Sequence, residues 1–121
     1  MAEPNFQVVK ITTDETYALR TAVLRAGTPT SDPKYAEDSK HGTVHLGIFD
    51  ANKILIATST WVINQWQEDP SAIAIQLRGM AVATSHQKSG LGKLLLDSGI
   101  AHAKTLNAKY VWANARDSAL D

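Results

Sequence analysis

The chain has 121 residues, of which 44% are hydrophobic and 20% are charged, and its twelve basic side chains balance twelve acidic ones. These values are typical of a globular protein, and they exclude a disordered, collagen-like or coiled-coil chain. The absence of cysteine excludes disulfides, thiolate zinc sites and cysteine nucleophiles. No apolar run is long enough to span a membrane, and residues 1–5 lack the features of a signal peptide. We therefore expect a cytoplasmic protein with a single domain over residues 1–121.

The charges are unevenly distributed along the chain. Residues 77–116 contain six basic side chains and one acidic side chain, whereas residues 1–76 contain six basic and nine acidic ones. A neutral chain does not resemble a general nucleic-acid binder, which usually carries a strong positive charge. The basic region suits either a small polyanion bound at one place or a solvated helix face that carries lysines.

The chain begins with a predicted strand and a predicted helix. Residues 6–11 carry branched side chains in partial alternation, which favours a strand. Thr12 and Glu15 have the spacing of a capping box, and apolar side chains then recur with helical spacing, which predicts a helix over about residues 14–25. Residues 28–42 contain two prolines and many polar side chains, so we expect a loop with room for one short helix.

Three strand-like runs follow, over residues 43–49, 54–63 and 72–82. Turn-forming residues at 50–53 separate the first two runs, and the polar segment 64–71 separates the second from the third. Such short connections predict an antiparallel meander.

A helix and a last strand complete the predicted elements. Leu91, Leu94 and Leu95 begin an apolar pattern with helical spacing that runs to Leu106, and Asn107 is suited to end the helix in a left-handed conformation. Residues 110–113 then read as a short strand. Strand, helix and strand in this order predict a βαβ unit with two parallel strands. The expected fold class is therefore α/β (α+β), a mixed sheet built from an antiparallel meander and a βαβ unit.

The segment Gln-Lys-Ser-Gly-Leu-Gly-Lys at residues 87–93 joins a predicted strand to a predicted helix. Glycines allow close approach to the backbone, and the start of a helix presents unpaired N–H groups that favour anions. Lys88 and Lys93 add positive charge, so the segment predicts a phosphate site. It is not a nucleotide P-loop, because one residue separates the glycines, nor a dinucleotide fingerprint, because Leu95 stands where a third small residue is needed.

The pattern Gln-x-x-Gly-x-Gly follows Leu-Arg-Gly-Met-Ala-Val at 77–82 and precedes a helix and the tail Ala-Asn-Ala-Arg at 113–116. In these features the sequence resembles the GNAT superfamily of N-acetyltransferases, mainly over residues 73–116. The resemblance implies a GNAT-like mixed sheet and acetyl-CoA as co-substrate, with the pyrophosphate on the loop and the pantetheine arm along the preceding strand. The cofactor-binding residues that it implies are Met80, Ala81, Val82, Gln87, Lys88, Ser89, Gly90, Leu91, Gly92, Lys93 and Asn114.

The activity that the resemblance implies is acetyl transfer from acetyl-CoA to a primary amine of a small molecule, peptide or protein. A non-catalytic acyl-CoA sensor or assembly module would keep the same motif, and a module for another nucleotide is a third reading. Neither a nucleic-acid partner nor a membrane partner is expected. With four scattered histidines and no cysteine, no metal is expected either.

No side chain stands out from the sequence as the general base. His45 could titrate near neutrality, but a histidine on a strand is more often structural. Glu37 and Asp38 lie in the irregular segment that covers the substrate in relatives, where they would either attract an amine or be solvated. Gln76 occupies the strand position at which many relatives place an acid. Arg20 and its neighbour Arg25 are expected on the exposed face of the first helix.

The last residues depart from the family pattern. Members often use a tyrosine beyond the Asn-Ala-Arg-like tail to protonate the thiolate, and this sequence ends at Asp121 before such a residue. The resemblance therefore implies that the closing strands are missing and that the strand at 110–113 has an open edge. We expect this chain either to associate, for instance as a homodimer, or to be less stable than a longer form.

Overall fold

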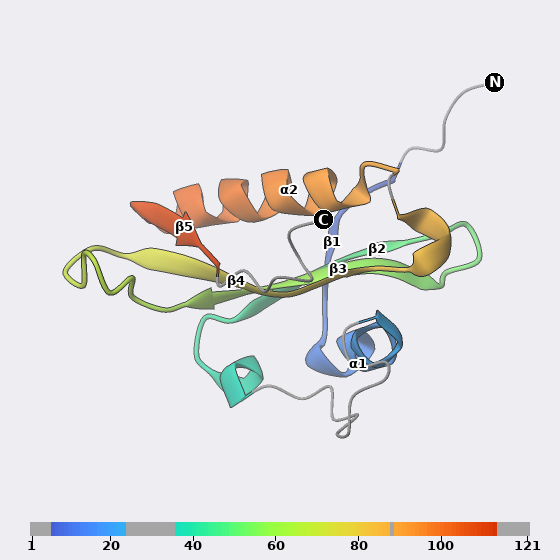
Figure 1. The fold of residues 1–121 in the computed structure, drawn as a ribbon, viewed down its shortest axis with the longest axis horizontal. Coiled ribbons are helices and arrows are strands. Elements are labelled where there is room, and N and C mark those ends of the chain that lie inside the picture. The colour runs from blue at the N-terminus through green and yellow to red at the C-terminus, as the bar shows by residue number, and fades with distance from the viewer. Residues whose placement is uncertain (1–5, 24–35, 88, 114–121) are drawn as a thin grey trace.

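The structure is a computed structural model, and it describes residues 6–23, 36–87 and 89–113. Five strands and two α-helices make up this part of the chain (Figure 1). In chain order the elements are β1 (Val9–Ile11), α1 (Thr13–Val23), the 3₁₀ helix η1 (Ala36–Ser39), β2 (Val44–Phe49), β3 (Leu55–Ile63), β4 (Ala74–Val82), the 3₁₀ helix η2 (Thr84–His86), α2 (Leu91–Thr105) and β5 (Tyr110–Trp112).

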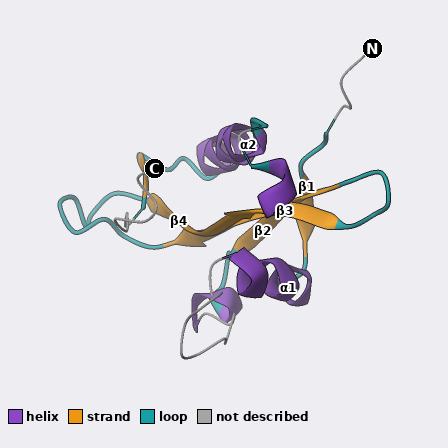
Figure 2. Ribbon diagram, turned by 45° about the vertical axis from the view of Figure 1, so that its right-hand side comes forward, coloured by secondary structure: helices purple, strands orange, loops and turns teal. Residues whose placement is uncertain are grey.

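The strands form one mixed sheet in the order β1-β2-β3-β4-β5. The first four strands pair antiparallel, which confirms the predicted meander, and β5 pairs parallel with β4, which confirms the predicted βαβ unit. The two helices lie on opposite sides of the sheet, as Figure 2 shows from a turned view. We therefore call the two faces of the sheet the α1 face and the α2 face.

The capping box that the sequence predicts forms at the start of α1. The amide of Thr12 donates to the carboxylate of Glu15 at 2.8 Å, and the amide of Glu15 donates back to the hydroxyl of Thr12 at 3.3 Å. Within the described residues the helix ends at Val23. One prediction for this helix was wrong: Arg20 is not on an exposed face but is fully buried against the sheet. Arg25 lies outside the described residues.

The hydrophobic core lies between the sheet and α2. Trp61 of β3 is fully buried against Gly99 of α2, where an added Cβ would stand 1.9 Å from the indole ring. The helix buries Leu91, Leu95, Gly99 and Ala103, whereas Leu94 is 39% exposed. The sequence pattern placed Leu94 on the apolar face of the helix, but the buried face continues through Gly99 and Ala103 instead. The reason is that the helix packs small residues against the large indole of Trp61.

Two predicted chain reversals also form. The carboxylate of Asp50 accepts hydrogen bonds from the amides of Asn52 at 2.8 Å and Ile54 at 3.0 Å, and Lys53 adopts a φ of 64°. Asn107 has a φ of 58° just after α2, as predicted for the residue that ends this helix. In the described parts of the chain, no helix is long and apolar enough to span a membrane.

Candidate functional site

The loop between β4 and α2 is held by its own side chains. The amide group of Gln87 donates to the carbonyl of Val82 at 3.1 Å, which ties the loop to the end of the strand. The hydroxyl of Ser89 donates to the carbonyl of His86. The imidazole of His86 is in turn hydrogen-bonded to the hydroxyl of Ser85 at 2.9 Å. These contacts hold the described residues of the loop, 83–87 and 89–90, close to the end of β4.

The two glycines of the loop differ in conformation and in what faces them. Gly90 is the N-cap of α2 with a φ of 86°, and no side chain caps this end of the helix. A Cβ added to Gly90 would meet nothing within 4 Å among the described residues, whereas a Cβ added to Gly92 would lie 3.9 Å from the sulfur of Met80. Gly90 thus faces open space and Gly92 faces the sheet. The amides of the first helical turn have no acceptor within the helix, so this end favours an anion.

The remaining predicted residues of the loop have different surroundings. The side chain of Leu91 is buried in the core, so only its backbone can face a ligand. The ammonium of Lys93 is 2.9 Å from the carboxylate of Asp97 on an exposed helix face, and 79% of the lysine side chain is accessible. Lys88 and Asn114 lie outside the described residues. The assignment of the whole set to acetyl-CoA stays a prediction from the sequence.

The strand β4 has one edge paired with β3 and one edge that β5 covers only at its start. The ladder with β5 runs from Ala74 to Gln76, opposite Tyr110 to Trp112, and β4 continues to Val82. We call the point where the two strands part, at Gln76 and Trp112, the fork. The other edge contains a bulge, because Thr58 and Thr60 of β3 pair with Ala81 and Arg78, two positions that are three residues apart.

The pairing of β4 with β3 shows which edge of β4 the backbone N–H and C=O groups of each residue face. The amide of Ala83 donates to the carbonyl of Ile56 in β3 at 2.7 Å. Because successive residues of a strand alternate, the backbone groups of Ala81 also point to β3, and those of Met80 and Val82 point to the opposite edge. Of the three predicted strand residues, Met80 and Val82 therefore present backbone groups at the edge beyond the fork. Gly79, in the bulge, has a φ of 58°, a conformation that glycine adopts without strain.

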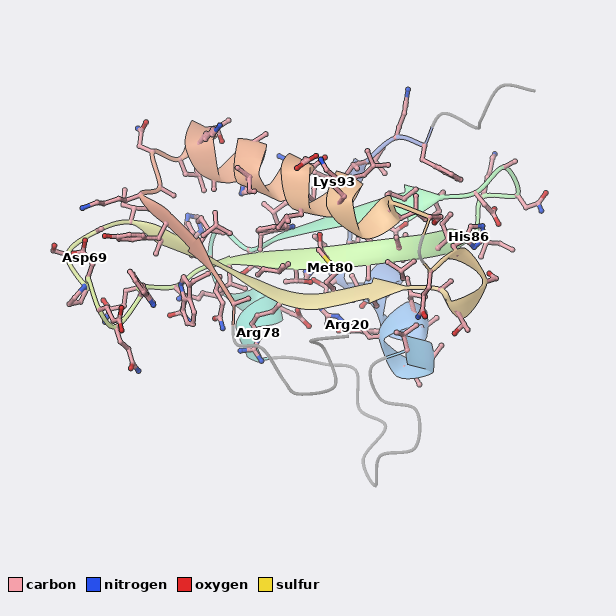
Figure 3. All side chains as sticks on the ribbon, turned by 45° about the horizontal axis from the view of Figure 1, so that its top comes forward. Arg20, Asp69, Arg78, Met80, His86 and Lys93 are labelled. Carbon is pink, nitrogen blue, oxygen red and sulfur yellow. The ribbon has the colours of Figure 1, made fainter. Side chains whose placement is uncertain are left out.

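The α1 face carries a buried polar network. The guanidinium of Arg20 binds both carboxylate oxygens of Asp38, at 2.8 and 2.9 Å, and donates to the hydroxyl of Thr60 at 2.7 Å. The two ring nitrogens of His45 are each 2.8 Å from a hydroxyl, that of Thr60 and that of Thr13. Figure 3 shows Arg20 on the side of the sheet away from α2. The network ties α1 and η1 to β2 and β3.

Within this network, the side chains of His45 and Asp38 are both bound to other side chains of the protein. Burial lowers the pKa of His45 below its ordinary value, the charge of Asp38 opposes this shift, and the charge of Arg20 adds to it. The imidazole is therefore neutral at physiological pH, and its side chain is 5% exposed. Asp38 forms a bidentate pair with Arg20, so its carboxylate is already neutralised. The side chain of Glu37 lies outside the described residues.

The fork is held by Asn64, which sequence reasoning did not single out. Its side-chain amide donates to the side-chain oxygen of Gln76 at 2.9 Å, and its backbone amide donates to the backbone carbonyl of Ala74 at 3.1 Å. The indole of Trp112 donates to the carbonyl of Asn64 at 2.9 Å. One asparagine thus binds both strands where they part. In the sequence Asn64 is one of several polar residues in the segment 64–71, and nothing there distinguishes it from its neighbours.

A second cluster closes the long connection between β3 and β4. The carboxylate of Asp69 accepts hydrogen bonds from the hydroxyl of Tyr110 at 2.8 Å and the ammonium of Lys109 at 3.3 Å. The hydrogen bond from Tyr110, followed by those from Lys109 and Ser71, lowers the pKa of Asp69. Trp66 packs on Tyr110 with ring centroids 4.7 Å apart. Among the described residues, no group of side chains could hold a metal ion.

The sequence matches a family model and a known protein. The model of the acetyltransferase (GNAT) family matches residues 13–120. The uncharacterized N-acetyltransferase YitI of Bacillus subtilis (strain 168) is 32% identical over 114 residues, which cover 91% of this chain and 73% of that protein.

Solved structures share the fold at low sequence identity. The glucosamine-6-phosphate N-acetyltransferase of Arabidopsis thaliana superposes with a TM-score of 0.68 and 16% identity, over 95% of this chain and 85% of that one. The ribosomal-protein-alanine N-acetyltransferase of Brucella melitensis biovar Abortus 2308 superposes with a TM-score of 0.72 and 17% identity, over 93% and 82%.

Proposed function

The chain belongs to the acetyltransferase (GNAT) family, and on this premise we propose that it transfers the acetyl group of acetyl-CoA to a primary amine. The observation that carries the proposal is the start of α2, where Gly90 has a φ of 86° and where, among the described residues, no side chain caps the helix and none lies in front of Gly90. Unpaired amides at a helix N-terminus favour a bound anion. The pyrophosphate of coenzyme A is such an anion, and the family supplies its identity.

The residues that would hold acetyl-CoA lie along one path. We assign the pyrophosphate to the backbone amides of residues 89–93 and the pantetheine arm to the edge of β4 beyond the fork. At this edge, which the described part of β5 leaves unpaired beyond Gln76, the backbone groups of Met80 and Val82 would act as donors and acceptors, while Gln87 keeps the loop attached to the strand. Bound acetyl-CoA would supply the acetyl group as a thioester that an amine lone pair can attack.

The protein would contribute to the transfer mainly through its backbone. A strand N–H beyond the fork would stabilise the negative charge that develops on the carbonyl oxygen. The amine must be neutral to attack, so its proton must leave first. The buried position at the fork is held by Gln76, whose carboxamide cannot take that proton. We therefore assign the proton to water rather than to a side chain at this position.

The same position favours a second candidate function. A domain that binds acyl-CoA as a sensor or assembly module would keep the loop and the strand edge but would need no base. Gln76 in place of an acid is the observation that fits such a domain. Both functions require binding of acyl-CoA, but only the enzyme would transfer the acetyl group to an amine. A measurement of acetyl transfer is therefore needed to distinguish them.

The test begins with binding. The melting temperature is measured with acetyl-CoA, CoA, ATP and NAD, because a ligand that binds only the folded state raises it. Stabilisation by acetyl-CoA and CoA, with little effect of ATP or NAD, is expected. Thiol release is then followed with a panel of primary amines. Stabilisation by ATP or NAD alone would refute the assignment, and binding of acetyl-CoA without turnover of any amine would favour the sensor.

A further inference from the structure

Side chains at both ends of β5 are hydrogen-bonded to the connection between β3 and β4. Tyr110, the first residue of β5, donates its hydroxyl to the carboxylate of Asp69 at 2.8 Å. Trp112, the last residue of β5, donates its indole N–H to the backbone carbonyl of Asn64 at 2.9 Å. The first of these bonds lies at the start of the ladder between β4 and β5, and the second lies at the fork, where the ladder ends.

The bond at the fork continues to β4 through the side chain of Asn64. Its amide donates to the side-chain oxygen of Gln76 at 2.9 Å. Gln76 is 2% exposed, so loss of this donor would leave a buried acceptor without a partner. Gln76 and Trp112 are partners in the ladder, so Asn64 binds both members of its last pair. We call the hydrogen bonds that run from Trp112 through Asn64 to Gln76 the fork link.

Under the proposed acetyl transfer, the reacting end of acetyl-CoA lies towards the fork link. The pyrophosphate is assigned to the loop that follows Val82, and the pantetheine arm is assigned to the edge of β4 that runs back from Val82 towards Gln76. Between these two residues the strand rises about 20 Å, at about 3.3 Å for each residue. Figure 3 shows Asp69 at one end of the sheet and His86, which precedes the start of α2, at the other. The thioester is therefore the part of the ligand nearest to the fork, and the pyrophosphate is the part farthest from it.

From this arrangement we infer that Asn64 is a positioning residue for acetyl transfer. Through the fork link it fixes the separation of β4 and β5 where the two strands part, and thereby the place of the thioester. The inference rests on the proposed function and names a residue that keeps its site in shape. A misplacement of about 1 Å at a reacting centre lowers a rate by about a hundredfold. Loss of the fork link should therefore lower kcat, whereas the affinity for CoA, which is gripped at the far end of β4, should stay.

The test removes single hydrogen bonds from the two ends of β5. Trp112→Phe removes the indole N–H that binds Asn64 at the fork, and Asn64→Ala removes the amide that binds Gln76. Tyr110→Phe is the matched control, because it removes the hydroxyl that binds Asp69 at the other end of the same strand. Each variant loses one partly buried hydrogen bond, so the melting temperature should fall by a similar few degrees in all three.

Activity is measured as thiol release from acetyl-CoA with the amine that the wild type uses best. We expect kcat to fall at least about tenfold in Trp112→Phe and in Asn64→Ala, and less than about twofold in Tyr110→Phe. Calorimetric affinity for CoA should stay within about twofold of the wild type in all three variants. A general loss of stability would not produce this difference between the two ends of β5. Circular dichroism checks folding, and Trp112→Phe, which keeps an aromatic ring, decides alone if Asn64→Ala is unfolded.

The outcomes separate this inference from the proposed function. An equal fall of kcat in Tyr110→Phe and in the two fork variants would overturn the inference, and so would a wild-type kcat in the fork variants. A loss of CoA affinity as large as the fall in kcat would also overturn it, because Asn64 would then support binding rather than the reaction. In each of these cases the wild type still transfers acetyl groups, and the proposed function stands. A wild type that binds no acetyl-CoA, or that acetylates no amine, would refute the proposed function and the inference with it.

Discussion

The two glycines at the start of α2 allow the anion site to be tested with single methyl groups. In Gly90→Ala the new methyl group enters the open space where we place the pyrophosphate, since nothing in the described chain lies within 4 Å of it. In Gly92→Ala the methyl group points to the sheet and makes an ordinary contact with Met80, 3.9 Å away. The two variants thus carry the same chemical change two residues apart, one facing the proposed ligand and one facing the protein.

The expected magnitudes follow from the backbone conformation. Gly90 has a φ of 86°, and an L-residue in the left-handed region costs about 1–2 kcal/mol, so Gly90→Ala should lower the melting temperature by a few degrees. Gly92 is helical, and alanine there should stabilise the protein by at most about 1 kcal/mol. The affinity for CoA should fall at least about tenfold in Gly90→Ala, because the methyl group prevents close approach of the phosphate. It should change less than about twofold in Gly92→Ala.

Isothermal calorimetry with CoA on the folded variants measures the effect. Gly90→Asn is a useful third variant, because asparagine tolerates the left-handed region better than alanine and yet fills the same space. Loss of affinity in both Gly90 variants would identify steric exclusion, and loss in Gly90→Ala alone would identify backbone strain. Wild-type affinity in Gly90→Ala, or an equal loss in Gly92→Ala, would refute the assignment of the anion to this helix end.

Three further predictions concern the scaffold around the site. Gly99→Ala places a methyl group 1.9 Å from the indole of Trp61, so chemical denaturation should show a loss of about 1–3 kcal/mol despite the better helix propensity of alanine; unchanged stability would contradict the packing. Asp38→Ala leaves the buried Arg20 without its carboxylate and should cost about 3–5 kcal/mol in the same assay, whereas a loss below about 1 kcal/mol would mean that the pair is dispensable. Because the pKa of His45 is lowered in the fold, the free energy of unfolding should keep its full value above about pH 6.5 and fall as the pH drops from there towards the folded pKa. His45→Gln should make this pH dependence less steep in chemical denaturation at a series of pH values. An unchanged pH dependence would mean that another group causes it.

The parts of the fold that could be predicted from the sequence are those with local signals. Thr12 and Glu15 form their capping box across three residues, and Asn107 ends α2 in the left-handed region as predicted. The burial of Arg20 could not be predicted, because its partners Asp38 and Thr60 lie 18 and 40 residues further along the chain. A basic residue in an amphipathic helix normally faces water. Only the fold shows that η1 brings the carboxylate of Asp38 to the buried side of α1.

The same contrast between local signals and contacts of distant residues applies to the two parts of the proposed site, the start of α2 and the fork. The anion site is made by one continuous segment, in which strand end, glycines and helix start follow one another, so its chemistry could be inferred from a motif. The α1 face at the fork is made by Asn64, Gln76, Arg78 and Trp112 from three different strands and their ends, with an asparagine side chain as the link. Residues at such positions can change one at a time without altering the loop to which we assign the anion. If the chain is the acetyltransferase that we propose, its acyl donor can stay the same while the acceptor varies, and for that reason the motif that identifies the family says nothing about the amine.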